Sequence, residues 1–264
     1  MPVSDEEAKQ VLNEVRKVAQ PSTDTLIRFD DSGTLVGLGS CLYVLSRDGK
    51  RSIGVTCNHV LKDGTKYFVG AERLDKPMIP RSELHEVPAV KVIQRFPQHD
   101  LAFFDLDGID LSVAKKSAID LSSASAITSE LLRRNLSNAM VIFGVPGYLA
   151  EFTKVDSSSI YAELPIYTAL GPLVDVDEDS LIGDFTEKKL LFANTAAFPK
   201  LEGDQATVGS RDLSGMSGSG GWIKSIDGIR VIGILARPKE ATESRHVIQF
   251  VPIWKVISSL NEIG

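Results

Sequence analysis

Apolar and polar positions repeat with two different periods along this chain. Near the start, apolar residues recur at helical spacing, namely Val11, Leu12, Val15 and Val18, which is typical of an amphipathic helix. Ser4 and Glu7 stand at the positions of a capping box, and Pro21 follows the last apolar position. The pattern therefore predicts a helix over residues 4–19.

Short runs of β-branched, aliphatic and aromatic residues then alternate with glycine, proline and Asp-Gly breakers. The first set predicts strands over residues 25–29, 35–45, 52–56, 66–69, 87–96 and 101–106. The second set predicts strands over residues 139–143, 149–155, 160–169, 190–193, 220–223, 230–235 and 247–251. Many short strands with such breakers favour a barrel or a sandwich.

Three other segments complete the expected organisation. Residues 108–136 are serine-rich and charged without alternation, so we interpret them as a linker, and the acidic residues 175–187 as an exposed loop. Pro252 opens a C-terminal helix. We expect an all-β chain of two antiparallel lobes with about six strands each: residues 1–22 as a helical extension, 23–120 as the first lobe and start of the linker, and 121–264 as the second lobe with the C-terminal helix.

Composition narrows the class of protein. The 264 residues are 43% apolar, which is enough for a sizeable core. The net charge of −6 does not indicate a nucleic-acid-binding protein. The charged first twenty residues do not resemble a secretory signal, and no segment approaches a membrane span. We expect a cytoplasmic protein with neither a nucleic acid nor a membrane as partner.

Cysteine usage agrees with this location. Cys41 and Cys57 are the two cysteines of the chain, which argues against a disulfide-stapled secreted protein. Pairing outward from the Asp48-Gly49 turn places them close together. Two buried thiols are the favoured interpretation, and a cross-strand disulfide is the alternative.

Three polar residues stand at the edges of predicted strands. His59 follows one strand, Asp100 precedes another, and Ser217 lies just before a third. The order His, Asp, Ser is one of the chain orders of the serine-nucleophile triad. Because the first two belong to one lobe and Ser217 to the other, the expected site lies in the cleft between lobes.

Neighbouring residues compete for these roles. Ser214 and Ser219 flank the candidate nucleophile, and Asp105 and Asp107 lie at the far end of the strand that begins after Asp100. Ser219 lacks a glycine two residues before it, and Ser214 is not followed by a glycine and a serine as Ser217 is. We therefore keep Ser217 as the candidate nucleophile.

Other chemistries fit less well. An α/β-hydrolase order on Ser217, Asp227 and His246 lacks the second elbow glycine and the alternating strands and helices. His246 is a surface residue or a lining residue of the substrate pocket. Cys57 stands in an apolar strand context, which disfavours a reactive thiol. No histidine or cysteine cluster has zinc spacing and no phosphate loop appears, so we expect neither a metal nor a cofactor.

The segments around the three residues resemble those of one enzyme family. Residues 56–60, Thr-Cys-Asn-His-Val, resemble the Thr-Ala-Ala-His run of chymotrypsin-fold (trypsin-like) serine peptidases. Residues 99–102, His-Asp-Leu-Ala, resemble their Asp-Leu-Ala run, and residues 215–219, Gly-Met-Ser-Gly-Ser, resemble their Gly-x-Ser-Gly run.

Two further segments extend this resemblance to about residues 24–260. Residues 142–147 resemble the Gly-x-Pro corner that begins the second barrel of the family. Residues 227–234 resemble the hairpin after the nucleophile in bacterial high-temperature-requirement proteases, and we expect no PDZ domain beside this unit. The resemblance implies two six-stranded antiparallel β-barrels.

The resemblance also implies roles. Ser217 is the expected nucleophile, His59 the general base and then acid, and Asp100 the orienting carboxylate. The backbone N–H groups of Gly215 and Ser217 form the expected oxyanion hole. The strand expected to pair with the substrate backbone consists of Ile234, Leu235 and Ala236.

The chain departs from the family at two positions. Met216 stands where digestive proteases have the aspartate that binds a newly cut N-terminal amine, so activation of that kind is not expected. Arg211 stands at the position of a specificity determinant, six residues before the nucleophile, where it would favour acidic P1 residues. The alternative is a solvated loop charge paired with Asp212.

The resemblance implies a serine endopeptidase that acts on a protein or peptide through an acyl-enzyme. We expect few targets and activation by a regulatory protein partner or by oligomerisation. A catalytically silent binding or scaffold module of the same fold is the alternative, because the aspartate before Ser217 is missing. The N-terminal helix is either the regulatory element or an extension packed on the first barrel.

Overall fold

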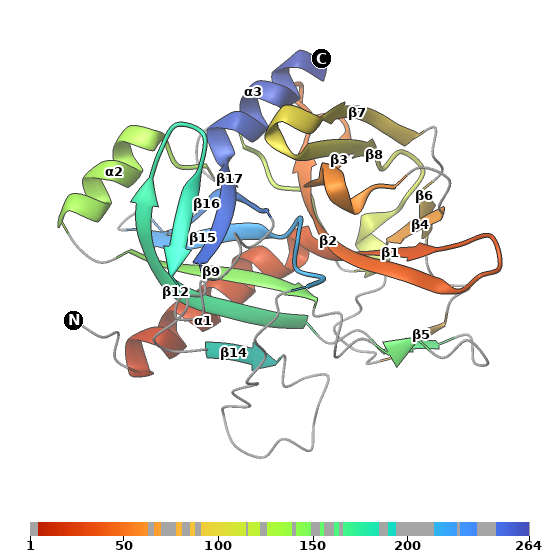
Figure 1. Cartoon of the computed structure of the whole chain (residues 1–264), viewed down its shortest axis with the longest axis horizontal. Coiled ribbons are helices and arrows are strands. Elements are labelled where there is room, and N and C mark those ends of the chain that lie inside the picture. Colours follow the sequence, from red (N-terminus) through yellow and green to blue (C-terminus); the bar gives the residue numbers. More distant parts are fainter. Residues whose placement is uncertain are drawn as a thin grey trace.

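The computed structural model describes residues 5–62, 66–69, 78–80, 85–87, 91–114, 116–121, 126–138, 141–148, 154–155, 161–163, 166–184, 190–193, 214–225, 228–236 and 247–263. Two curled antiparallel sheets of seven strands each make up most of this part of the chain (Figure 1). A small third sheet joins segments of both halves, in the order β10 (Lys154–Val155), β11 (Tyr161–Glu163) and β5 (Met78–Pro80).

The first sheet is built from the N-terminal half of the chain. Its strands are β1 (Thr23–Phe29), β2 (Leu35–Leu45), β3 (Ser52–Cys57), β4 (Lys66–Val69), β6 (His85–Val87), β7 (Val92–Phe96) and β8 (Leu101–Asp105). They lie in the order β6-β4-β1-β2-β3-β8-β7. Both faces of β2 are buried, since Leu42 and Val44 point into one core cluster and Cys41 and Tyr43 into another.

The second sheet closes on itself. Its strands are β9 (Val141–Tyr148), β12 (Ile166–Val176), β13 (Leu181–Asp184), β14 (Leu190–Ala193), β15 (Gly220–Ser225), β16 (Gly228–Leu235) and β17 (Val247–Pro252). Their order is β13-β17-β16-β15-β9-β12-β14, and an additional β13–β12 pairing closes six of them into a ring. The short strands β6 and β14 add a seventh strand to each sheet, and the expected all-β architecture of two six-stranded barrels is confirmed.

Three α-helices accompany the sheets in the described part of the chain: α1 (Asp5–Ala19), α2 (Ser129–Asn138) and α3 (Ile253–Ile263). The terminal helices α1 and α3 confirm those expected from the sequence. Helix α1 packs against β15, β9 and β12, with Val15 and Ala19 fully buried (Figure 1). It therefore lies on the second sheet and not on the first barrel, although it directly precedes β1 in the sequence.

Two segments differ from the sequence interpretation. The supposed linker contains α2, in which Leu132 and Leu136 lie four residues apart and pack on the core, a pattern hidden by the polar residues around them. The supposed acidic loop is the β12–β13 hairpin, whose turn is closed by a hydrogen bond from the Asp177 N–H to the Ser180 carbonyl. Leu181 after that turn is fully buried, which anchors the hairpin in the sheet.

The cysteines are buried thiols that no disulfide joins, which confirms the favoured interpretation. Leu42 pairs with Val55 across β2 and β3, and Cys41 and Cys57 point into different core clusters. No helix in the described ranges is long and apolar enough to cross a membrane.

Candidate active site

The side chains of His59 and Asp100 meet at one end of two paired strands. His59 lies in a short 3₁₀ turn after β3, and Asp100 lies between another 3₁₀ turn and β8. Because β3 and β8 are adjacent, with Cys57 opposite Leu101, both turns emerge at the same end of the sheet. The structure thus joins two residues that are 41 positions apart in the sequence.

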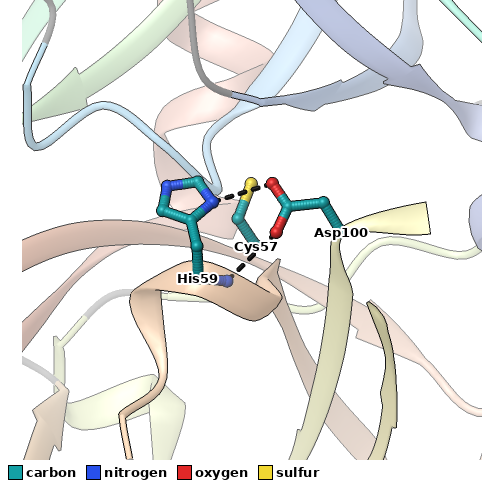
Figure 2. Close-up of side chains that lie close together, drawn as sticks. All are labelled: Cys57, His59 and Asp100. Carbon is teal, nitrogen blue, oxygen red and sulfur yellow. Dashed lines mark hydrogen bonds and ion pairs between the residues drawn. The ribbon is translucent and has the colours of Figure 1, made fainter. Parts of the chain in front are cut away.

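The carboxylate of Asp100 holds His59 at two points (Figure 2). Its Oδ2 lies 2.7 Å from the ring Nδ1 of His59, and its Oδ1 accepts a hydrogen bond of 3.0 Å from the His59 backbone N–H. A carboxylate only accepts hydrogen bonds, so the Nδ1 atom carries a proton. The remaining ring nitrogen, Nε2, is then the basic one and is able to take a proton from a hydroxyl.

Asp100 adopts a left-handed backbone conformation, with φ 51° and ψ 39°. Among the described residues it is the only non-glycine with a positive φ. Aspartate tolerates this region better than most residues, and such conformations often occur at functional sites. Here the conformation turns the chain from the 3₁₀ segment into β8 while the carboxylate stays on His59.

The loop that carries Ser217 is fixed to both sheets. The hydroxyl of Ser40 on β2 donates a hydrogen bond of 2.8 Å to the Gly215 carbonyl. The N–H of Gly218 donates one of 2.9 Å to the Leu235 carbonyl on β16. Met216, at the position where digestive proteases have an aspartate, is fully buried in the core. The Met216 side chain therefore anchors the loop through packing.

Ser217 and His59 line the same cleft, which has a volume of about 380 Å³. The described residues around Ser217 provide no hydrogen bond to its hydroxyl, and none joins it to His59. Catalytic hydrogen bonds of this kind are often long in the absence of substrate. The backbone N–H groups of Gly215 and Ser217 donate no hydrogen bond to a described residue, so a developing oxyanion could accept from both.

Three of the four rival residues lie away from the cleft of Ser217 or cannot be reached from it, and Ser214 lines that cleft. Ser219 is fully buried, so it is closed to substrate, whereas Ser214 lines the cleft. The Asp105 carboxylate lies at the opposite end of β8 from Asp100 and accepts a hydrogen bond from the Asp107 N–H. Among the aspartates weighed from the sequence, Asp100 is the one in contact with His59.

The three expected substrate-pairing residues lie at the end of β16. Leu235 donates to the Ser219 carbonyl and accepts from the Gly218 N–H, while the Ala236 N–H donates to the Gln249 carbonyl. Ile234 pairs with residues of β15 and β17. Ala236 also lines a second cleft, beside Asp100. Pairing of this segment with a substrate stays a prediction, and Arg211, Asp212 and His246 lie outside the described residues.

Sequence reasoning missed two residues of the cleft, Arg28 and Lys62, and did not place the Cys57 thiol beside His59 and Asp100. Arg28 and Lys62 line the cleft of Ser217, and the Sγ of Cys57 lies beside His59 and Asp100. The Arg28 guanidinium donates hydrogen bonds of 2.8 Å to the Val36 carbonyl and 3.5 Å to the Val60 carbonyl. An arginine inside the apolar run of β1 was the signal that could have identified it.

Comparisons with known proteins agree with this architecture. No protein-family model matches the chain, and no curated protein matches its sequence. A crystal structure of the thermostable serine protease AL20 from an extremophilic microorganism is 11% identical, with a TM-score of 0.52, and the match covers 92% of this chain and 96% of that one. The serine endoprotease from Yersinia pestis is 14% identical, with a TM-score of 0.53, over 100% of this chain and 67% of that one. The chain therefore has the chymotrypsin-like double-barrel fold found in these serine proteases.

Proposed function

We propose that this protein is a serine endopeptidase. The observation that carries the proposal is the contact of 2.7 Å between the His59 imidazole and the Asp100 carboxylate, at the edge of the cleft that Ser217 also lines. A hydroxyl becomes a useful nucleophile when an oriented imidazole removes its proton. The fold shared with serine proteases supports the same reaction class.

In the proposed reaction, the Oγ of Ser217 attacks the scissile carbonyl while its proton passes to Nε2 of His59. Asp100 then stabilises the imidazolium through Nδ1. The N–H groups of Gly215 and Ser217 would bind the oxyanion, each contributing roughly 2.7–4 kcal/mol to the barrier reduction. His59 returns the proton to the leaving amine, and a water repeats the sequence on the acyl-enzyme to release the acid product.

Partner-controlled activation on a few protein targets is part of the proposal. Ser217 and His59 share the cleft without a hydrogen bond between them, so a bound substrate or a partner must bring the hydroxyl and Nε2 together before proton transfer. The same observation is compatible with the second candidate, a silent binding module of this fold. The two candidates differ in whether Ser217 ever becomes nucleophilic.

A fluorophosphonate probe tests this directly, since it reacts covalently with activated serines. We expect labelling of the wild-type chain, no labelling of Ser217→Ala, and retained labelling of Ser214→Ala, whose serine lines the same cleft. Circular dichroism confirms that each variant is folded. Labelling that survives in Ser217→Ala would overturn the assignment of the nucleophile. A folded wild-type chain that never labels, alone or in lysate with its partners, would favour the binding module.

A further inference from the structure

A thiol, an imidazole and a carboxylate lie together beside the proposed nucleophile. One ligand atom each from Cys57, His59 and Asp100 lies within 4.8 Å of the other two (Figure 2). The Cys57 side chain is fully buried, whereas His59 and Asp100 are 22% and 34% exposed. The group is therefore closed on the thiol side and open on the cleft side. We propose that these three residues form an inhibitory zinc site.

The set of ligand types fits zinc better than other common ions. Thiolate, imidazole and carboxylate are the protein ligands of Zn²⁺, at about 2.0–2.3 Å, whereas Mg²⁺ and Ca²⁺ take oxygen ligands. Tetrahedral ligand atoms then lie about 3.3–3.8 Å apart. The His59–Asp100 contact of 2.7 Å must widen a little and the thiol must approach. Side-chain rotation supplies such movements.

Zinc binding at Nδ1 of His59 and proton transfer at Nε2 require opposite tautomers of the imidazole. Zn²⁺ would displace the proton of the Cys57 thiol, which goes to solvent, and the proton on Nδ1 of His59, which moves through solvent to Nε2. The Asp100 carboxylate would then bind the metal and no longer orient the imidazole. The thiol now donates a hydrogen bond of 3.0 Å to the Leu235 carbonyl. That carbonyl keeps the Gly218 N–H as a donor after the thiol is lost, so metal binding leaves it partnered.

The other cysteine provides a matched control. Cys41 is equally buried and also on the first sheet, but it points into the core cluster on the other face of β2. Its neighbours there are Asp24 and Tyr43, and its Sγ donates to the Asp24 carbonyl at 3.7 Å. Cys41 does not belong to the group of potential metal ligands in the described residues. Its removal should leave metal binding unchanged.

Metal binding can be measured without any activity. Co²⁺ serves as a spectroscopic substitute for Zn²⁺, because a thiolate ligand produces a charge-transfer absorption in the near ultraviolet. We expect this band in the wild-type chain and in Cys41→Ala, its removal by added Zn²⁺, and its absence in Cys57→Ala and Cys57→Ser. Competition with a chromophoric chelator should show that the two Cys57 variants bind zinc at least tenfold more weakly than the wild-type chain. Mutating a residue that only hydrogen-bonds to a metal ligand already weakens metal binding by about 10–100-fold. A missing band in the folded wild-type chain overturns the site.

The inhibitory part rests on the proposed peptidase function and has its own readout. Zn²⁺ should suppress fluorophosphonate labelling of the wild-type chain, and a chelator should restore it. For each Cys57 variant, labelling with zinc is compared with labelling of the same variant without zinc. Suppression of labelling in these variants should require at least tenfold more Zn²⁺ than in the wild-type chain. A Cys57-dependent cobalt band without any probe labelling would retain the metal site and reject the peptidase. Equal zinc sensitivity in the wild-type chain and the Cys57 variants would reject inhibition through this site.

Discussion

The backbone N–H of Ser40 donates a hydrogen bond of 2.8 Å to the carbonyl of Ser217. This bond joins β2 of the first sheet to the loop that precedes β15 of the second, across 177 positions of sequence, as the difference between the two residue numbers shows. The position of the candidate nucleophile therefore depends on how the two sheets pack together.

Gly218 is required for that loop to approach β2. A Cβ at this position would lie 2.0 Å from the Ser40 carbonyl oxygen, and its φ of +95° disfavours other residues. We expect Gly218→Ala to destabilise the fold by more than the cost of left-handed backbone alone, about 1–2 kcal/mol. The control is Gly49→Ala, where φ is +71° and nothing lies within 4 Å. Urea unfolding measures both, and equal losses would contradict the close-approach argument.

The role of the Asp100 carboxylate is tested by Asp100→Asn. Asparagine tolerates the left-handed conformation and its side-chain oxygen can still accept from the His59 N–H, so the fold should persist. Its amide does not stabilise the imidazolium and favours the wrong tautomer, so kcat should fall by roughly 10³–10⁴-fold. Asp105→Asn, at the other end of β8, is the control and should keep its activity. Peptide hydrolysis rates decide, and similar rates for the two variants would contradict the role.

The cleft of Ser217 carries positive charge. Arg28 and Lys62 both line it, and the buried Nε of Arg28 has no hydrogen-bond partner within the described residues. We expect peptides with Asp or Glu in this cleft to be hydrolysed faster than neutral ones. Arg28→Gln should lower kcat/KM for the acidic peptides by about tenfold, since hydrogen bonds to charged groups contribute about 1.5–3 kcal/mol. Lys50→Gln, at an exposed turn, is the control. An equal loss on acidic and neutral peptides would contradict the charge argument.

The buried thiol of Cys41 and the buried phenol of Tyr43 predict a loss of stability at alkaline pH. Burial, followed by the nearby Asp24 charge, raises the pKa of Cys41 well above its ordinary 9.0 and that of Tyr43 well above 10.0. Above these values the unfolded chain releases protons that the native chain keeps. The free energy of unfolding should then fall with rising pH, by up to about 1.4 kcal/mol per pH unit and group.

Urea unfolding in reducing buffer between pH 8 and 11 measures this slope. In Cys41→Ala, the free energy of unfolding should fall less steeply above about pH 9, the ordinary pKa of a cysteine. In Tyr43→Phe, it should fall less steeply above about pH 10, the ordinary pKa of a tyrosine. Tyr43→Phe also removes the donor of the 2.7 Å hydrogen bond to the buried Asp24 carboxylate. It should therefore cost about 1–3 kcal/mol already at neutral pH. An unchanged slope in both variants would contradict the prediction.

We expect helix α1 to stabilise the second sheet mainly through packing, and its ion pair to contribute less. Val15 is fully buried against that sheet, so Val15→Ala should reduce the free energy of unfolding by roughly 1–3 kcal/mol. Glu14, the residue before Val15, has its carboxylate 2.7 Å from the Lys224 ammonium in a partly exposed ion pair. Glu14→Gln should change stability by less than about 1 kcal/mol. A larger loss in Glu14→Gln than in Val15→Ala would show that the helix is held by the ion pair.

Local signals accounted for most of the secondary structure. The helical spacing before Pro21 and the strand pattern around Asp48-Gly49 depend on near neighbours in the chain, and both elements occur as expected. Helix α2 was missed because the buried Leu132 and the partly buried Leu136 stand among polar residues. The β12–β13 hairpin was missed because acidic composition concealed one buried leucine, Leu181.

By itself, the sequence determined the two sets of strands, the two terminal helices and the order of His59, Asp100 and Ser217, because these features follow from local periodicity and from residue order. Tertiary structure alone decided which side chains meet. The strand register that sets Cys57 opposite Leu101 brings Asp100 to His59 and the thiol to both. The docking of α1 on the second sheet likewise depends on how the sheets curl. Such contacts arise between residues distant in the chain, and no local pattern encodes the geometry in which their surfaces are buried together.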